Sequence, residues 1–501
     1  MSGRVSKTEL FASLPPPWPD ELRPQLRAAV AAQPDHKLVV LDDDPTGTQT
    51  VHDVPVLTTW AVATLERELA AAGPCFYILT NSRSLPPDQA AALTRELAQN
   101  LREAVWRRKG FTAEPRHARQ LCCQAFTLVS RSDSTLRGHF PIETDVLAEE
   151  LGPFDAVILI PYFEAGGRYT IHDTHYVAEV DTLVPAAETP FAHDKAFGYR
   201  SSHLPAYVEE KTGGHVKAGE VVSFSIEELR TGAENFEPTR NLLSKLLKLR
   251  SERMATVVVN ACSVADVEFF ALATHWAENA GGGYLFRTAA QFVAARLGLE
   301  PQPLWQPDFK PGAWNAHGLV AARQPGGLTI VGSYVPKTTE QLAHLEKSGA
   351  VVVWTLKVES LLNEAEREQT IQEAVFQLEL SYRRGGEVVL ATSRNLIAGA
   401  DAAASLAIGN RVSDALVEIV QRLTVRPRYL IAKGGITSSD LAVRGLGVKR
   451  ALVRGQLLPG VPVWELGDET KFPGLPYIVF PGNVGGPTAL AEAVEKLAVA
   501  R

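Results

Sequence analysis

Three adjacent aspartates are the first residues of the chain whose type and spacing could support chemistry. Asp42, Asp43 and Asp44 follow the apolar run 38–41 and precede a Pro-Thr-Gly-Thr segment that ends at Thr48. A short continuous apolar run predicts a strand buried on both faces of a parallel sheet. Open α/β sheets bind their ligands at the carboxyl ends of such strands. We therefore predict a ligand site here, whereas one aspartate alone would indicate only that the strand reaches solvent.

Three later apolar runs also lead directly into polar segments. The runs cover residues 76–79, 125–129 and 156–160. The polar segments that follow them are Thr80–Ser84, Ser130–Phe140 and Pro161–Thr170. Helices predicted at 61–72, 87–108 and 141–151 separate the runs, which indicates right-handed βαβ crossovers and a parallel sheet. All four polar segments are then expected at one edge of that sheet.

These polar segments combine carboxylates, guanidinium groups and hydroxyls. The charged residues are Asp42, Asp43, Arg83, Arg131, Asp133, Arg137 and Arg168. Guanidinium groups bind carboxylate or phosphate through two parallel hydrogen bonds, and an aspartate can orient a hydroxyl or accept its proton. The set fits a small polyhydroxylated acid. The alternative is that the arginines and aspartates form structural ion pairs with one another.

The second half of the chain shows the same alternation with a different chemistry. Strands predicted at 328–331, 429–432 and 477–480 end in loops rich in glycine, serine and threonine, namely Gly332–Ser333, Lys433–Asp440 and Pro481–Gly486. Glycine-rich loops that open onto a helix expose backbone N–H groups to phosphate. The motif GxxxxGK[ST] does not occur, and no GxGxxG follows the first strand. Three such loops at strand ends nevertheless predict a nucleotide-phosphate site.

Length and composition indicate how many domains the chain has and which functions and locations are excluded. The 501 residues allow two or three domains, and residues 301–327, rich in proline and glycine, are expected to link domains at 37–300 and 328–501. Residues 1–36 predict a tail and one helix at 19–32, and residues 171–240 resemble a loop-rich insertion. The net charge of −7 gives no reason to expect nucleic acid. Without a long apolar run or a signal-peptide pattern, we expect no membrane span and a cytoplasmic location.

Cysteines and histidines offer little further chemistry. Four cysteines in so long a chain do not predict a disulfide framework, and the adjacent pair Cys122 and Cys123 is expected in the core. The two histidines His172 and His175, with Asp173 between them, imitate metal-ligand spacing, but no further ligands to complete a site are visible nearby. We therefore expect polar loop residues there.

Eight segments taken together resemble a known family. In chain order they are LDDDPTGT, TNSRS, SRSDSTLRG, GGRYT, GSYVPKTTEQL, KGGITSSDL, GQLLPGVPVW and PGNVGG. From about residue 37 to the end, the chain resembles the four-carbon acid sugar kinases, which act on threonate, erythronate and 3-oxo-tetronate. The resemblance implies an N-terminal domain that binds the acid sugar and a C-terminal domain that binds ATP.

The resemblance also implies site residues. For ATP they are Ser333, Gly434, Gly435, Ile436, Thr437 and Gly482. For the acid sugar they are Asp42, Thr46, Gly47, Arg83, Ser134, Thr135, Arg137 and Arg168. The chain departs from the family at Arg131, His139, Phe480 and Pro481, where lysine, asparagine, lysine and serine are usual, and it is longer around 171–240. These departures affect the prediction of which sugar acid is bound more than the prediction that ATP is used.

Together these patterns predict two α/β domains with mostly parallel sheets and ligand sites that face an interdomain cleft. We expect an ATP-dependent kinase for a hydroxyl of a small sugar acid, with closure of the cleft excluding water. Asp43 is the first candidate for the catalytic base and Asp133 the second. ATP implies Mg²⁺, whose ligands the sequence does not identify, and a homo-oligomer is a possible assembly. The alternatives are a nucleotide-using lyase or oxidoreductase, and a non-enzymatic two-domain sensor of sugar acids.

Overall fold

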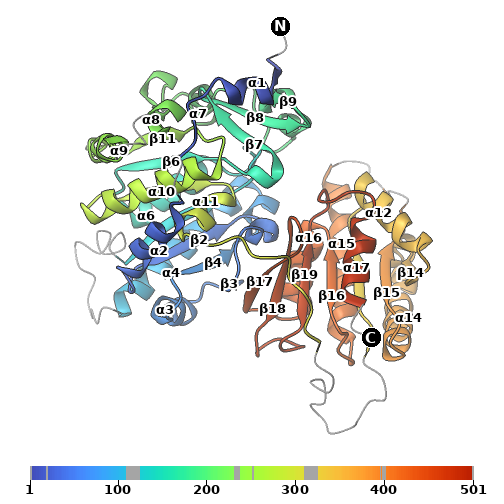
Figure 1. Cartoon of the computed structure of the whole chain (residues 1–501). Helices are drawn as coiled ribbons and strands as arrows, with labels where there is room; N and C mark the ends of the chain where they lie inside the picture. Colours follow the sequence, from blue (N-terminus) through green and yellow to red (C-terminus); the bar gives the residue numbers. More distant parts are fainter. Residues whose placement is uncertain are drawn as a thin grey trace. The chain divides into compact units, whose positions relative to one another are not determined.

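The computed structural model describes residues 3–18, 21–108, 125–230, 237–250, 253–309, 325–394, 397 and 402–498. Its residues divide into two compact units, Met1–Pro301 and Gln302–Arg501 (Figure 1). Each unit is described by itself. Cys122, Cys123 and much of the predicted linker lie outside the described residues. In the part of the chain that the structure describes, no helix is both long and apolar enough to span a membrane.

The N-terminal unit is built on a parallel sheet. Within its described residues the strand order is β10-β11-β6-β12-β5-β2-β4-β3, and every neighbouring pair is parallel. The strands are β2 (Lys37–Asp42), β3 (Val54–Leu57), β4 (Cys75–Leu79), β5 (Phe126–Arg131), β6 (Ala156–Ile160), β10 (Val222–Phe224), β11 (Ala255–Val259) and β12 (Tyr284–Thr288). The central strands are buried along their whole length because helices cover both faces. The predicted parallel sheet is confirmed.

Two groups of helices cover this sheet. The helices α3 (Val62–Ala70), α4 (Pro87–Arg108) and α6 (Ile142–Leu151) pack against one another. A second group, α2 (Arg23–Ala31), α9 (Glu237–Leu247) and α11 (Gln291–Arg296), packs on α10 (Val264–Asn279). The crossovers of the two groups run in opposite directions along the sheet, so right-handed connections place the groups on opposite faces. The helices predicted at 61–72, 87–108 and 141–151 are confirmed.

A small antiparallel sheet changes two expectations. Its order is β1-β9-β8-β7, with β1 (Val5–Ser6), β7 (Arg168–Ile171), β8 (Thr174–Glu179) and β9 (Thr182–Pro185). The start of the chain is therefore a strand followed by α1 (Lys7–Ala12), and the prediction of a tail was wrong. The predicted loop-rich insertion at 171–240 also contains α7 (Leu204–Lys211), β10 and α8 (Ile226–Arg230). β1 gives little local signal because its partner β9 is distant in sequence, with Val5 paired to Leu183. β7, β8 and β9 instead form consecutive hairpins with turns at 172–173 and 180–181, and these were not predicted from the sequence.

The C-terminal unit has a mixed sheet of order β17-β18-β19-β16-β13-β15-β14. The strands are β13 (Leu328–Val331), β14 (Val352–Leu356), β15 (Val388–Thr392), β16 (Leu430–Lys433), β17 (Arg450–Leu458), β18 (Val461–Leu466) and β19 (Pro476–Phe480). The helices are α12 (Pro336–Lys347), α13 (Val358–Leu362), α14 (Glu364–Arg383), α15 (Ala402–Arg422), α16 (Gly435–Asp440) and α17 (Ala489–Ala498). The neighbours β14, β15, β13, β16 and β19 are parallel. β18 pairs antiparallel with both β19 and β17 and so forms an antiparallel edge. The predicted fold class is confirmed, although β18 was not predicted.

Candidate functional site

The carboxyl ends of β2 and β5 place the first aspartate beside an arginine. Asp42 pairs with Arg131 in the strand register, and Arg131 Nη1 lies 3.1 Å from Asp42 Oδ1. Asp42 is only 1% exposed. Burial raises the pKa of Asp42 to about 7, because the loss of hydration outweighs the attraction of Arg131. This carboxyl can therefore gain or lose a proton near neutral pH.

Asp43 has the opposite electrostatic environment, although it is only 2% exposed. Its carboxylate accepts hydrogen bonds from Arg83, whose Nε lies 3.2 Å from Oδ2 and whose Nη2 contacts Oδ1, and from Ser132 Oγ at 2.6 Å. Burial alone would raise the pKa of Asp43, but Arg83, Arg287 and Arg131 outweigh it and hold the pKa below its usual value. Asp43 is therefore a firmly ionised carboxylate.

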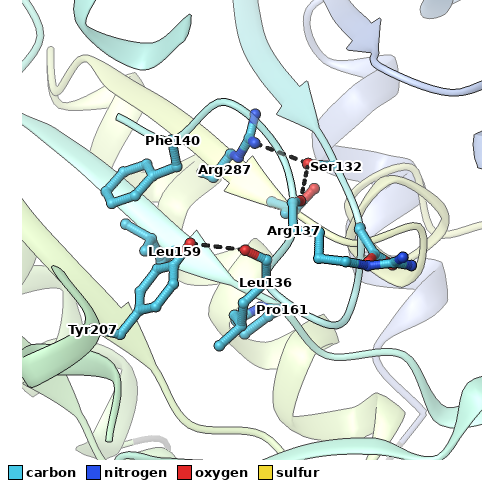
Figure 2. A pocket seen from close by; sticks show the side chains of 10 residues that line it. Ser132, Leu136, Arg137, Phe140, Leu159, Pro161, Tyr207 and Arg287 are labelled. Atoms are coloured by element: carbon cyan, nitrogen blue, oxygen red, sulfur yellow. Dashed lines mark hydrogen bonds and ion pairs between the residues drawn. The ribbon is translucent and has the colours of Figure 1, made fainter. Parts of the chain in front are cut away.

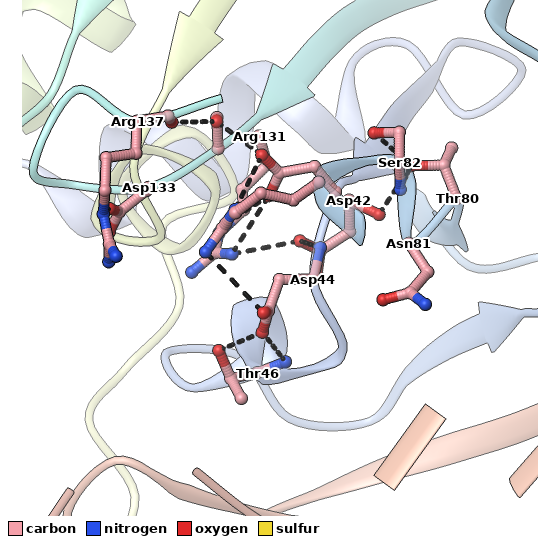
Figure 3. A network of polar contacts seen from close by, with 12 residues as sticks. Asp42, Asp44, Thr46, Thr80, Asn81, Ser82, Arg131, Asp133 and Arg137 are labelled. Atoms are coloured by element: carbon pink, nitrogen blue, oxygen red, sulfur yellow. Dashed lines mark hydrogen bonds and ion pairs between the residues drawn. The ribbon is translucent and has the colours of Figure 1, made fainter. Parts of the chain in front are cut away.

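Arg83 also reaches the third aspartate, Asp44, which Figure 3 shows beside Thr46. Its Nη1 lies 3.6 Å from Asp44 Oδ2, while Asp44 Oδ1 accepts from the backbone N–H and the hydroxyl of Thr46 at 2.9 and 2.5 Å. These bonds form the turn that carries Gly47. A Cβ on Gly47 would overlap the Asp42 carboxylate, so only glycine fits there. Arg83 thus forms ion pairs with two aspartates, as expected from the alternative in which the arginines and aspartates of this edge pair with one another.

The loop after β5 forms the next part of this edge. Arg137 Nε lies 2.5 Å from Asp133 Oδ2, which also accepts from the Thr135 hydroxyl. Burial would raise the pKa of Asp133, but Arg83 and Arg137 together lower it to about 2. Gly138 has a φ of 126°, and a Cβ there would overlap Ser132 Oγ. The loop therefore presents an ionised carboxylate that is already paired.

Two arginines share one aromatic ring at this edge. The guanidinium carbons of Arg137 and Arg168 lie 5.1 and 5.4 Å from the ring centre of Phe191, and Arg137 Nη1 lies 3.7 Å from Asp194 Oδ2. The Arg168 guanidinium has no hydrogen bond or ion pair with any residue that the structure describes, and its Nε is buried. Burial lowers the pKa of Arg168 from its usual value. An unpaired, partly desolvated guanidinium favours an anionic ligand.

Sequence reasoning missed a buried network that supports this edge. Arg287 on β12 donates to Ser132 Oγ at 2.8 Å, to Ser130 Oγ at 2.7 Å and to Glu143 Oε2 at 2.6 Å. Ser82 Oγ donates to Glu143 Oε1 at 2.5 Å. The network thus joins the ends of β4, β5 and β12. Its only sequence signal was one arginine within the apolar run 284–288.

The second candidate site lies at the carboxyl edge of the C-terminal sheet. Gly434 follows β16 with a φ of 118°, and a Cβ there would lie 2.9 Å from the Ser333 Cβ. A Cβ on Gly482 would lie 3.6 Å from Ser333 Oγ. The ends of β13, β16 and β19 therefore lie together. Gly435 begins α16, and the Ile436 side chain is 62% exposed. All six residues predicted to contact ATP are brought to this edge.

A buried lysine that was not predicted holds the last of these loops. Lys433 Nζ donates to the carbonyls of Pro481 at 2.5 Å and Gly482 at 3.3 Å, and Thr338 Oγ1 donates to the same Gly482 carbonyl at 3.1 Å. Gln341 Nε2 donates to the carbonyl of Val484 at 2.9 Å. Burial lowers the pKa of Lys433 to about 7. These contacts fix the loop beside the glycine turn.

Comparison with known families assigns both units. Residues 38–296 match a sugar-binding N-terminal domain, and residues 328–490 match a nucleotide-binding C-terminal domain. These two domains form the four-carbon acid sugar kinase family, DUF1537, and the chain belongs to this family. The family resemblance drawn from the sequence is confirmed.

Solved structures share the fold. A Salmonella typhimurium LT2 protein, provisionally described as a tRNA synthase, superposes with a TM-score of 0.63 at 16% identity, covering 91% of this chain and 98% of that one. A Haemophilus influenzae protein of DUF1537 superposes with a TM-score of 0.57 at 17% identity, covering 91% and 99%. At these identities the likeness shows the fold alone. A comparison with curated proteins found no match.

Proposed function

We propose that the protein is an ATP-dependent kinase that phosphorylates a hydroxyl of a small sugar acid, most simply one of four carbons. Residues 37–300 bind the acid and residues 328–501 bind the nucleotide. The observation that carries the proposal is the unpaired Arg168 guanidinium beside Arg137, at the same sheet edge as Asp42 and Asp43. One sheet edge thus combines cations for a carboxylate with acceptors for hydroxyls.

Arg168 is the first choice for the substrate carboxylate because it need give up no hydrogen bond or ion pair with the described residues, and its contact with the Phe191 ring leaves the guanidinium edge free. Arg137 would share the anion with it. Arg83 is different, since it already binds Asp43 and Asp44 and would contact the substrate only by exchanging one of these bonds. Thr46, Gly47, Ser134 and Thr135 complete the proposed acid-sugar site.

Transfer needs a group that orients the attacking hydroxyl and takes its proton. The paired and ionised Asp43 suits orientation, and it stays our first candidate, with Asp133 second. Asp42 is a further candidate, as the group that accepts the proton, because a pKa near 7 is closest to the pH at which the enzyme would work. Replacing each aspartate by asparagine separates these roles.

The glycine edge supports the nucleotide half of the proposal. Gly434 and Gly435 let a phosphate approach the backbone, and Ser333 and Gly482 lie beside them. Across the described ranges, no three His, Cys, Asp or Glu side chains are grouped so as to hold a metal ion. Mg²⁺ is commonly held by substrate phosphates, water and one or two carboxylates, so we propose it as part of MgATP without naming a protein ligand.

The test is ADP release from MgATP with a panel of four-carbon sugar acids that includes D-erythronate, D-threonate and 3-oxo-tetronates. We expect turnover that depends on both the acid and ATP, and loss of turnover in Arg168→Ala. A phosphorylated product must be found by mass spectrometry. Acid conversion without a phosphorylated product would favour the lyase or oxidoreductase, and binding without turnover would favour the sensor.

A further inference from the structure

Three side chains hold consecutive carbonyls of the loop Asp133–Gly138. The donors are His175 Nε2 on β8, the Tyr199 hydroxyl, and the Tyr207 hydroxyl on α7. In the same order, the acceptors are the carbonyl oxygens of Ser134, Thr135 and Leu136, at 2.8, 2.8 and 2.9 Å. All three donors come from the segment 171–240. This segment therefore has a direct contact with the proposed acid-sugar site.

Each donor is itself held in place. His175 is fully buried, and its Nδ1 lies 2.9 Å from Thr170 Oγ1. Burial lowers the pKa of His175 to about 4, so the ring is neutral at pH 7 and its Nε2 can donate while Nδ1 accepts from the threonine. The rings of Tyr199 and Tyr207 pack edge to face with centres 5.6 Å apart. The three donors together form a clamp on this loop.

The clamp determines where the loop amides point. In a trans peptide, the C=O and the following N–H point in opposite directions. Binding of the Ser134 and Leu136 carbonyls therefore turns the N–H groups of Thr135 and Arg137 away from the clamp. Neither N–H has a hydrogen-bond partner in the described part of the chain, whereas the Leu136 N–H donates to the Asp133 carbonyl at 3.2 Å.

The backbone and the side chains of this loop agree with an anion site. Leu136 has a φ of 67°, and a left-handed residue within a turn is typical of concavities whose N–H groups bind anions. Figure 2 shows the Leu136 carbonyl directed to the Tyr207 hydroxyl, while the Arg137 side chain extends to the other side of the loop. A cavity of about 30 Å³ lies against the loop and is lined by both its polar and its apolar residues, among them Asp133, Leu136, Arg137 and Tyr207.

We infer that His175, Tyr199 and Tyr207 are positioning residues, which direct the N–H groups of Thr135 and Arg137 to the carboxylate of the acid sugar. The inference rests on the proposed function and adds backbone donors to its site. It also gives the long segment 171–240 a role in substrate selection. No side chain of the clamp needs to touch the substrate.

The variants Tyr199→Phe and Tyr207→Phe remove only a hydroxyl. We expect each to raise the KM for the acid that the parent turns over by about 3- to 10-fold, and the double variant by more, since each loses one modest hydrogen bond. The KM for ATP should stay within about twofold, and the melting temperature should fall by only a few degrees. Restoring a donor with His175→Gln should retain more acid affinity than His175→Phe.

Tyr77→Phe is the matched control. The Tyr77 hydroxyl is buried on β4 and has no hydrogen-bond partner among the described residues, so its loss breaks no bond. Hydrogen exchange of the full chain supplies a second readout. Saturating D-erythronate or D-threonate, whichever is turned over, should slow exchange in the peptide that covers Ser132–Gly138.

The outcomes separate the two proposals. If the clamp variants match Tyr77→Phe in the KM for the acid, or if the bound acid leaves exchange of the loop unchanged, the inference is overturned while the kinase proposal stands. If the parent neither binds nor phosphorylates any acid of the panel, the proposed function fails and the inference fails with it. A selective rise in the acid KM together with slower exchange supports the inference.

Discussion

Replacing Asp42 by asparagine should stabilise the protein at neutral and alkaline pH. Burial raises the pKa of Asp42 from 3.8 to about 7, so the folded state binds the proton more tightly than the unfolded state. The stability that this protonation contributes is fully present below pH 4 and is lost as the pH rises to 7. A shift of about three pKa units corresponds to roughly 4 kcal/mol, which we take as the upper limit.

Asparagine keeps the shape of the neutral acid and removes the cost of ionising it. Arg131 retains a counter-charge because its Nη1 lies 3.9 Å from Asp43. We expect Asp42→Asn to match the parent near pH 4 and to exceed it by about 2–4 kcal/mol at pH 8, or roughly 5–10 °C in melting temperature. Thermal unfolding of both proteins between pH 4 and 8 measures this difference.

Asp44→Asn is the control, because it removes a neighbouring carboxylate whose side chain is 22% exposed and therefore better solvated. It removes only the repulsion that Asp44 adds to the larger effect of burial on Asp42, so any gain that grows with pH should be much smaller than in Asp42→Asn. A variant at position 42 that is less stable than the parent at pH 8, or whose difference does not change with pH, would refute the argument from burial. The same variant should lose most activity if Asp42 accepts the proton.

Four further outcomes are expected. If Asp42 must be ionised, kcat/KM of the parent should rise with pH through about 7, whereas Asp42→Asn should show no such rise at its residual rate. Asp43→Asn should lower kcat by about 10²–10⁴ while the acid still binds, and a stable variant with near-normal kcat would make Asp133 the next candidate. Arg168→Ala should reduce kcat/KM roughly 10- to 100-fold, equivalent to about 1.5–3 kcal/mol, without loss of stability, and equal losses in ATP affinity would contradict its assignment to the acid. Gly435→Val should raise the KM for ATP and leave acid binding intact, and unchanged ATP affinity in the folded variant would move the nucleotide site elsewhere.

The parallel core could be predicted because its strands are continuous apolar runs. β2, β4, β5 and β6 are buried on both faces, so each appears in the sequence as an apolar segment with a polar end, broken only by Thr127 in β5. β12 is as long as β4 and β6, but it was missed because a buried arginine interrupts its apolar run.

The site could be predicted only in outline. Residue types at strand ends indicated the edge where Asp42, Asp43, Arg83 and Arg168 meet. They could not indicate that Arg83 would bind Asp43 and leave Arg168 unpaired, because pairing depends on distances that only the tertiary structure defines. The opposite pKa shifts of Asp42 and Asp43 also depend on the tertiary structure, because burial dominates at Asp42 and nearby arginines dominate at Asp43. His175 appeared to be a loop residue because its acceptor is a backbone carbonyl, which leaves no trace in the residue types.

The position of β12 between β5 and β6 constrains how the N-terminal unit can form during synthesis. β5 and β6 do not pair with each other, and each pairs with β12, which the ribosome completes only at Thr288. Until then the middle of the sheet has a gap one strand wide, and Ser132 and Glu143 lack the Arg287 guanidinium. A chain truncated before Tyr284 would contain every residue of the proposed acid-sugar site and still be unable to close its central sheet. Fragments designed to isolate this site should therefore extend beyond α11.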